Sequence, residues 1–330
     1  MPLITAIYRY PIKGLSPQPL PVVVVEAGKP IPHDRVFALA RPGVPIDPEE
    51  PRWAKKGLFI MLMLEEMLAR VQTHLDVDTL RLTIADGERH LLSADLADAA
   101  GREEIERFFH RLVPTLSAPP RLVHARAGHF MDKPDNVMSL INLATVRSLE
   151  EQWGCKIDPL RFRANFYIDG PKPWHEFDWV GSDIRLGDAL FRVDRRNGRC
   201  GATNVDPKTG RRDLDIPRML RAAFGHKDLG IYLMARTGGK IAVGDPAECP
   251  DVDARAAEFA PAAPAPVSAA DYHGFICRGC YYIYNEALGS PQHAIPPGTL
   301  FAALPSNWRC PDCGTDKATF RPYLPSTATT

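Results

Sequence analysis

The sequence lacks an excess of charge of either sign. Its 330 residues contain 40 Lys and Arg and 40 Asp and Glu, so the formal net charge is zero. Proteins that bind nucleic acid through their overall field carry a net positive charge. We therefore expect no nucleic acid and no membrane among the partners. The local basic clusters Arg195-Arg196 and Arg211-Arg212 are either anion sites or solvated surface.

Long apolar runs are also missing. The longest, residues 58–64, is far shorter than the roughly 20 residues that a membrane-spanning helix needs. The first five residues, MPLIT, show no basic segment that leads into an apolar one, so we expect no secretory signal. The odd number of cysteines, 7, favours a reducing cytoplasm over a disulfide framework, because four of them have metal-ligand spacing.

The sequence shows no internal repeat and no parallel βαβ rhythm. Strands are predicted at residues 21–26, 80–85, 166–169 and 189–194, where β-branched or alternating apolar residues occur. Turn signals are Gly170-Pro171, Asn197-Gly198 and Gly238-Gly239. This pattern predicts an α+β fold that is rich in β structure, with barrel-like antiparallel sheets.

Helices are fewer. They are predicted at residues 58–69, 103–113, 145–153 and 217–224 from apolar residues at helical spacing. Thr145 is the expected N-cap of the third helix, and Gly154 and Gly225 stand where a left-handed residue ends a helix. The methionines of the first helix are expected in the core.

A Pro- and Ala-rich tract, FAPAAPAPVSAA, occupies residues 259–270. Such a tract cannot bury a core and is either an extended polyproline spacer or a disordered tether. It predicts that the chain ends in a separate module. The predicted boundaries are 251–270 for the linker and 271–330 for the module.

The final module contains Cys277, Cys280, Cys310 and Cys313, which form two C-x2-C pairs separated by 29 residues. Four thiolates make a tetrahedral site that selects zinc or iron. About sixty residues bury too little surface to fold without help, so we expect a structural metal here. The spacing alone leaves open a zinc ribbon and an iron centre.

Residues 272–323 resemble rubredoxin. The motifs that carry the resemblance are the two cysteine pairs, Tyr282 and Tyr284, GT-x-F at 298–301, LP at 304–305 and WRCPDCG at 308–314. The resemblance implies one iron, bound by Cys277, Cys280, Cys310 and Cys313, that carries one electron at a time. Tyr281 departs from the family, which usually has glycine at this place.

Of the other three cysteines, Cys200 differs from Cys155 and Cys249. It follows a strand-like segment and adjoins Arg199, and a positive neighbour favours the thiolate. The residues alone leave open a structural and a reactive cysteine. Cys155 and Cys249 are interpreted as a small buried residue and an incidental one.

Residues 199–210, RCGATNVDPKTG, resemble the cysteine loop of MOSC-domain molybdenum proteins, the group that includes the amidoxime-reducing components. Further matching strings are YPIKG at 10–14, DR at 34–35, RFRAN at 161–165, FDW at 177–179 and the segment 239–245. The resemblance covers roughly residues 3–247. It implies an N-terminal β-barrel-like domain at residues 1–115 that packs on a MOSC β-barrel domain, which binds the cofactor, at residues 116–250.

The same resemblance implies a molybdenum–molybdopterin cofactor. Cys200 would be the catalytic residue and the molybdenum ligand, because a soft thiolate completes the sulfur set that the pterin begins. The cofactor phosphate calls for Lys and Arg donors. The candidate cofactor-binding residues are Lys13, Arg35, Arg163, Asn165, Arg199, Thr203 and Asn204. Asp206 either orients the cysteine loop or caps a turn.

An iron carrier fused to a molybdenum domain implies an electron-fed oxidoreductase. The predicted reaction is reduction of small N-hydroxylated, N-oxide or S-oxide compounds with electrons from the chain's own rubredoxin domain. An NAD(P)H-dependent reductase of the rubredoxin or ferredoxin type is the expected donor. One alternative is a sulfur carrier with a persulfide on Cys200 and a zinc-ribbon docking module. Another is the same chemistry run in the oxidising direction.

Overall fold

The computed structural model describes residues 2–250, 274–277, 282–290, 294–311 and 316–323. The chain divides into two compact units. The first comprises residues 1–54 and 58–262, and the second comprises residues 55–57 and 263–330.

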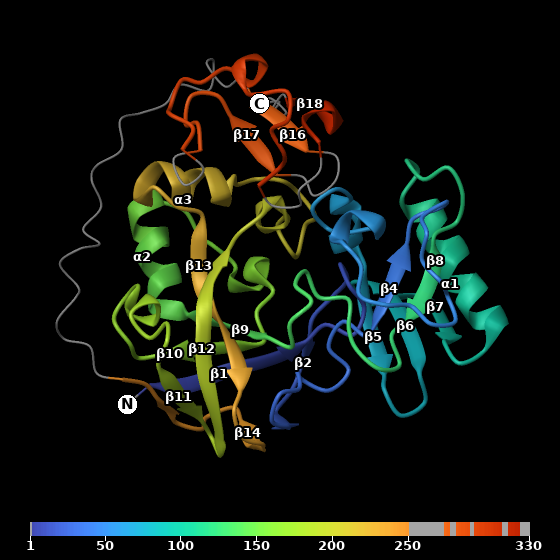
Figure 1. Ribbon diagram of the computed structural model, residues 1–330. Helices are drawn as coiled ribbons and strands as arrows, with labels where there is room; N and C mark the ends of the chain where they lie inside the picture. Colours follow the sequence, from blue (N-terminus) through green and yellow to red (C-terminus); the bar gives the residue numbers. More distant parts are fainter. Residues whose placement is uncertain (1, 251–273, 278–281, 291–293, 312–315, 324–330) are drawn as a thin grey trace. The chain divides into compact units, whose positions relative to one another are not determined.

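The first unit is built around a mixed eight-stranded sheet (Figure 1). Its strand order is β15-β11-β12-β13-β9-β10-β1-β2. In that order the strands are β15 (Ala247–Glu248), β11 (Asp183–Leu186), β12 (Ala189–Gly198), β13 (Asp228–Ala235), β9 (Met138–Asn142), β10 (Phe166–Asp169), β1 (Leu3–Arg9) and β2 (Gln18–Pro19). Every neighbouring pair is antiparallel except β9 and β10.

The parallel pair corrects one prediction from the sequence. β9 connects to β10 through helix α2 (Leu143–Trp153) and the 3-10 helix η3 (Pro159–Phe162), which is a βαβ crossover. All five residues of β9 are buried, so its sequence MSLIN shows no alternation. The sequence analysis missed this βαβ unit because one short buried strand among antiparallel strands leaves no periodic pattern of apolar residues.

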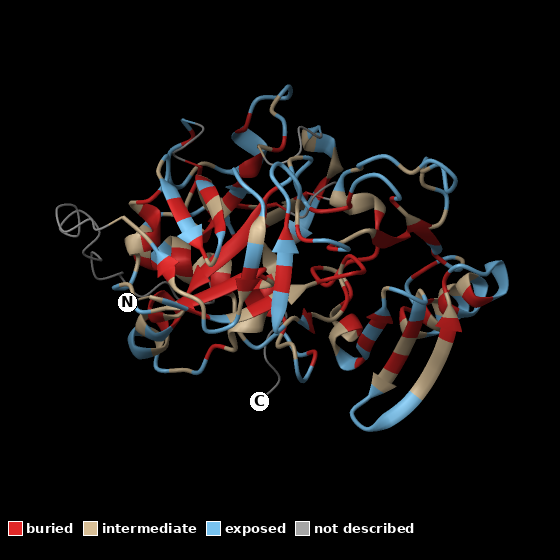
Figure 2. Cartoon of the chain, turned by 90° about the horizontal axis from the view of Figure 1, so that it is seen from below, coloured by how far each residue is buried: buried red, intermediate tan, exposed pale blue. Residues whose placement is uncertain are grey.

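The large sheet separates two apolar cores. On one face, Val146 of α2 and Leu220 of helix α3 (Ile216–Phe224) pack with Ile141 and Tyr167 of the sheet. The other face packs against the two-stranded sheet of β3 (Val22–Val25) and β14 (Gly239–Ala242). In Figure 2 buried residues occupy the strands in the interior of the cartoon, while many of the loops at its edge are exposed.

The remaining elements of the first unit form a smaller β-rich part with its own core. Strand β4 (Phe37–Ala40) pairs with β8 (Arg121–His124). Strands β5 (Gln72–Asp76), β6 (Arg81–Asp86) and β7 (Arg89–Asp95) form an antiparallel sheet, and helix α1 (Ala99–Leu112) packs against β7 and β8. With three α-helices among the described residues, the predicted β-rich α+β fold is confirmed.

The helix predicted at residues 58–69 is wrong. Only short 3-10 turns, η1 (Lys56–Leu58) and η2 (Glu66–Arg70), occur there. The carbonyl of Leu58 accepts from Arg41 N–H at 2.8 Å, and Ile60 N–H donates to Leu39 at 2.9 Å, so this backbone bonds to the end of β4 instead of to itself. Met61 and Met63 are buried, as expected.

Two local predictions also need correction. The N-cap of α2 is Asn142, whose side chain accepts from Ala144 N–H, while Thr145 lies inside the helix. Asn197-Gly198 is not a turn but the end of β12, paired with β13 through a bulge. A bulge and a turn share the same residue types, so the sequence does not separate them.

The second unit contains a three-stranded antiparallel sheet in the order β17-β16-β18. Its elements are β16 (Gly274–Cys277), β17 (Ile283–Asn285), η8 (Phe301–Ala303), η9 (Lys317–Thr319) and β18 (Phe320–Tyr323). The core is aromatic, and Phe275 stacks on Phe301 with ring centroids 4.2 Å apart. Cys277 and Cys310 are buried. Cys280, Tyr281 and Cys313 lie outside the described residues.

Candidate functional site

The Cys200 loop, defined as residues 199–213, leaves the end of β12 and begins with the 3-10 helix η5 (Gly201–Asn204). Cys200 is partly buried. Its carbonyl accepts from both the backbone N–H and the hydroxyl of Thr203, at 3.1 and 2.9 Å. The first turn of the loop therefore closes on the backbone of Cys200 and fixes the position of that residue.

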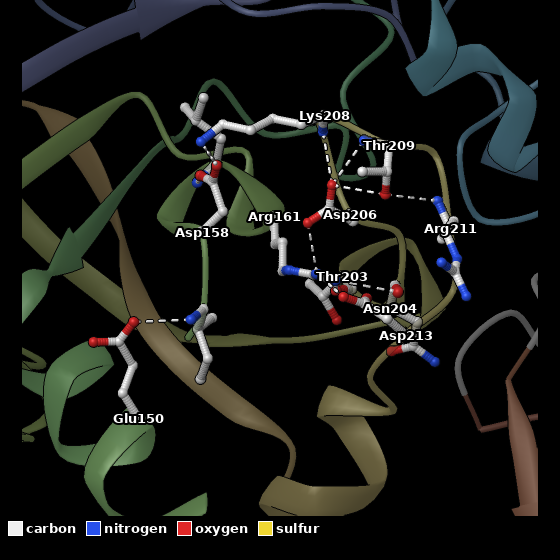
Figure 3. A network of polar contacts seen from close by, with 12 residues as sticks. Glu150, Asp158, Arg161, Thr203, Asn204, Asp206, Lys208, Thr209, Arg211 and Asp213 are labelled. Atoms are coloured by element: carbon white, nitrogen blue, oxygen red, sulfur yellow. Dashed lines mark hydrogen bonds and ion pairs between the residues drawn. The ribbon is translucent and has the colours of Figure 1, made fainter. Parts of the chain in front are cut away.

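The buried guanidinium of Arg161 holds the Cys200 loop from behind (Figure 3). Nη1 donates to the carbonyls of Thr203 and Asn204 at 3.4 and 3.2 Å. Nη2 donates to Asp206 and Asp213 at 3.0 and 2.7 Å. A fork of donors that reaches two carbonyls and two carboxylates restrains both sides of the loop.

Asp206 performs both roles that the sequence left open. One carboxylate oxygen pairs with Arg161 and orients the loop. The other accepts from the backbone N–H groups of Lys208 and Thr209 at 3.0 and 2.8 Å, which caps the turn. Burial alone would raise the pKa of Asp206, but the bonds from Thr209 and Lys208 and the charge of Arg161 lower it.

Arg199 and Asn204 also bond to the protein. Nε and Nη1 of Arg199 donate to the carbonyls of Leu229 and Phe162 at 2.7 and 2.9 Å. Burial lowers the pKa of Arg199. The amide of Asn204 donates to Asp215 and accepts from Ile216 N–H at the start of α3, both at 3.1 Å. These side chains brace the loop.

Two members of a basic group, defined as Lys13, Arg35 and Arg163, lie over the buried ring of Tyr10. The guanidinium carbons of Arg35 and Arg163 lie 4.2 and 4.4 Å from the ring centroid. Both arginines have positive φ angles, +53° and +50°, which L residues rarely adopt. Backbone strain of this kind persists where the surroundings enforce it, often at functional sites.

The three cations of the basic group differ in their partners. Lys13 is buried and pairs with Asp132. Arg35 pairs with Asp34 and donates to the carbonyl of Arg163 at 2.9 Å. The guanidinium of Arg163 makes no hydrogen bond and no ion pair with the described residues. It lies over the ring of Tyr10, and the charges of Asp132 and Asp34 act on it without forming an ion pair.

Asn165 fastens this region from within. Its Nδ2 donates to Asp34 and to the carbonyl of Tyr8, both at 3.1 Å, and its Oδ1 accepts from Ser139 N–H at 3.1 Å. The residue is only 1% exposed. Its amide is therefore occupied in joining the Asp34-Arg35 turn to the large sheet.

Tyr232 of β13 connects the Cys200 loop with the basic group. It lies within electrostatic reach of Cys200, Arg199, Arg35 and Asp132. Burial is the main cause that raises the pKa of Tyr232; Arg199 and Arg35 lower it, and Asp132 and Cys200 raise it further. The sequence analysis missed this residue. An isolated tyrosine in a strand carries no motif, and only the pairing of β12 with β13 brings it beside the loop.

The chain matches two protein families. Residues 127–248 match the MOSC domain, and residues 274–320 match rubredoxin. A probable rubredoxin of Methanothermobacter thermautotrophicus is 52% identical over 46 residues, which are 14% of this chain and 73% of that protein. Rubredoxin-2 of Pseudomonas aeruginosa is 50% identical over 44 residues, which are 13% of this chain and 80% of that protein.

The similar solved structures are more distant. YiiM from Geobacillus stearothermophilus has a TM-score of 0.28 and 18% identity, and the match covers 34% of this chain and 54% of YiiM. The YuaD protein from Bacillus subtilis has a TM-score of 0.34 and 13% identity, with coverages of 76% and 96%.

The first unit thus contains a MOSC domain. The chain therefore contains a MOSC domain at residues 127–248 and a rubredoxin domain at residues 274–320. The rubredoxin domain supports an iron cofactor and electron transfer with redox partners. Across the described parts of the chain, no helix has the length and apolarity to cross a membrane.

Proposed function

We propose that this protein is a molybdenum-dependent oxidoreductase that reduces N-hydroxylated, N-oxide or S-oxide compounds with electrons from its own rubredoxin domain. The observation that carries the proposal is the guanidinium of Arg163. It lies over the ring of Tyr10 beside Arg35 and makes no ion pair with a described residue. Arg35 and Cys200 both affect the pKa of Tyr232, which supports one site for the basic group and the thiol. A cation held in this way is suited to an anionic ligand.

The residues fit a molybdenum–pterin cofactor. The Cys200 thiolate is the soft ligand that molybdenum takes besides the two pterin sulfurs. Arg163 and Arg35 offer planar donors for the phosphate, and Lys13 adds a point charge. To Asn165, Arg199, Thr203 and Asn204 we give a supporting role, because their polar groups bond to the protein.

Each part of the chain then has a defined task. The cofactor, when bound, supplies two-electron oxygen-atom transfer. Arg161 and Thr203 fix the backbone around Cys200, and the fixed backbone limits the orientations of the Cys200 side chain. Four cysteines of the rubredoxin domain, Cys277, Cys280, Cys310 and Cys313, would hold one iron, which would supply single electrons. An external NAD(P)H-dependent reductase would load that iron.

The proposed domain arrangement keeps the boundaries predicted from the sequence. We assign residues 1–115 to the N-terminal β-barrel-like domain and 116–250 to the cofactor-binding MOSC domain. Residues 251–270 would be the linker and 271–330 the rubredoxin domain. The matched segments, 127–248 and 274–320, lie inside the second and the last of these ranges.

The test replaces Cys200 with alanine in the full chain, with Cys155→Ala as the matched control. Cys155 is also partly buried, and it packs in the core beneath α2. Reduction of an N-hydroxylated substrate by a reduced electron donor should disappear in C200A and persist in C155A. Unchanged turnover in C200A would contradict the role of the thiolate.

Metal analysis gives an independent test. Protein from a molybdenum-replete host should contain molybdenum and iron in equal amounts. Zinc without molybdenum would instead support the sulfur-carrier alternative. Since this measurement requires no substrate, it separates a missing cofactor from a wrongly chosen reaction.

A further inference from the structure

The side chain of Asn197 fixes the hydrogen bonding of Tyr232. Asn197 is buried near the end of β12, between Arg199 and Tyr232. Arg199 carries only donors, so the amide oxygen of Asn197 must face it. In this orientation Oδ1 accepts from Nη2 and Nη1 of Arg199 at 3.2 and 3.3 Å, and Nδ2 donates to the phenol oxygen of Tyr232 at 3.0 Å.

This arrangement makes the Tyr232 oxygen an acceptor and leaves its hydrogen for another partner. A tyrosine hydroxyl has one hydrogen to donate, and Asn197 cannot receive it, because its oxygen faces Arg199. No other described residue accepts from this hydroxyl. The hydrogen of Tyr232 is therefore available to a ligand that supplies an acceptor.

The ring of Tyr232 packs against a cation, and its hydroxyl is the group that would meet a ligand. The guanidinium carbon of Arg195 lies 5.2 Å from the ring centroid. The residue as a whole is partly buried. Cys200, Arg35 and Asp132 all lie within electrostatic reach of the phenol. The free hydrogen therefore belongs to the site that contains the reactive thiol.

We infer that the hydroxyl of Tyr232 donates a hydrogen bond to the oxygen atom of the substrate at the Cys200 site. The inference rests on the proposed function and adds to it a preference for ligands that carry an oxygen acceptor. Ligands that present an N–O or S–O oxygen accept this hydrogen bond, and the reduced products, which lack that oxygen, do not. The site would therefore retain substrate and release product.

The test measures binding to the full-length oxidised protein without an electron donor, so that no turnover occurs. Titration calorimetry with pyridine N-oxide should give a Kd about 3- to 10-fold weaker for Tyr232→Phe than for the wild type, as expected for one lost neutral hydrogen bond. Pyridine, which lacks the oxygen, should bind equally to both. Dimethyl sulfoxide extends the comparison to an S–O oxygen.

Tyr8→Phe is the matched control. The Tyr8 ring packs edge-on against Tyr167, with centroids 5.6 Å apart, and its hydroxyl has no hydrogen bond among the described residues. This variant should keep the wild-type Kd. Equal Kd values for pyridine N-oxide in Y232F and the wild type would overturn the inference, and so would a wild type that binds pyridine as tightly as its N-oxide.

The outcome is separable from that of the proposed function. The proposed function is tested by the molybdenum content and by the loss of turnover in C200A. The ratio of the Y232F and wild-type Kd values judges Tyr232. An active wild type, an inactive C200A and an unchanged Kd in Y232F would reject the role of Tyr232 alone.

Discussion

Glu176 is a fully buried carboxyl whose partners are neutral. The hydroxyl of Thr145 donates to both of its oxygens at 2.9 Å, and the amide of Asn142 donates at 3.1 Å. Burial, which outweighs these bonds, raises the pKa of Glu176 from the ordinary 4.5 to about 7. The short 3-10 helix η4 (His175–Phe177) is thereby tied to the start of α2.

This carboxyl predicts a pH dependence of stability. The folded protein binds the proton more tightly than the unfolded chain, so the contribution is complete below pH 4.5 and is lost as pH rises through 7. The loss amounts to about 3 kcal/mol. In Glu176→Gln the free energy of unfolding should not show this decline, as measured by denaturant titration between pH 5 and 8. The exposed Glu104→Gln variant should keep it. A wild-type slope in E176Q would refute the assignment.

Arg163 lets backbone strain be separated from ligand binding. Its φ of +50° suits glycine, so Arg163→Gly should be about 1 kcal/mol more stable than Arg163→Ala, which keeps the strain. Both variants lose the guanidinium and should lose molybdenum to the same extent. Denaturant titration and metal analysis of the pair check this. Full molybdenum content in either variant would exclude Arg163 from the site.

At the scale of elements, the large sheet positions the site through a close approach of β13 to β9. Gly230 has a φ of +72°, and an added Cβ would lie 2.4 Å from the carbonyl oxygen of Leu140. The same Cβ would lie 3.1 Å from Nη2 of Arg199, which braces the Cys200 loop. The pairing of two strands and the placement of the loop therefore depend on one glycine.

Two glycine variants test this dependence. Gly230→Ala combines backbone strain with overlap and should cost roughly 3 kcal/mol of stability. Gly225→Ala at the end of α3 has a similar φ, +74°, but no atom within 4 Å of the added Cβ, so it should cost only about 1 kcal/mol. Molybdenum content should fall in G230A only. Equal unfolding free energies for the two variants would contradict the close packing.

At the scale of the whole molecule, the rubredoxin domain predicts two separable routes for electrons. Cys277→Ser should remove the visible absorption of the iron and stop turnover driven by an NAD(P)H-dependent reductase. Turnover driven by a small chemical reductant should continue, because that reductant reaches the Cys200 site directly. Reductase-driven turnover at the wild-type rate in C277S would argue against the domain as the carrier.

Cys249→Ala is the control for that experiment. Burial raises the pKa of the Cys249 thiol to about 12, so it stays protonated and unreactive, and it packs against the core of the large sheet. Both routes should persist in this variant. A loss of iron in C249A would indicate that removing a buried thiol has a general effect on folding.

Sequence reasoning predicted local features well and spatial neighbours poorly. The ends of α2 and α3 agree with the glycines at 154 and 225, because the left-handed φ that ends a helix is a property of one residue. The prediction of a helix at 58–69 was wrong, because the backbone there makes hydrogen bonds to the end of β4 instead of bonds within a helix. For the Cys200 loop the sequence indicated the segment but not which of its side chains already bond to the protein.

By itself, the sequence determined the two cysteine pairs, the motif around Cys200 and the β-rich class, because each depends on residue type and short spacing. Only the tertiary structure decided that Arg199, Asn204 and Asn165 brace the backbone while Arg163 makes no ion pair with a described residue. The physical reason is that a polar side chain acquires its role from whatever it can bond to. For Tyr232, those groups come from strands joined by pairing and not by sequence.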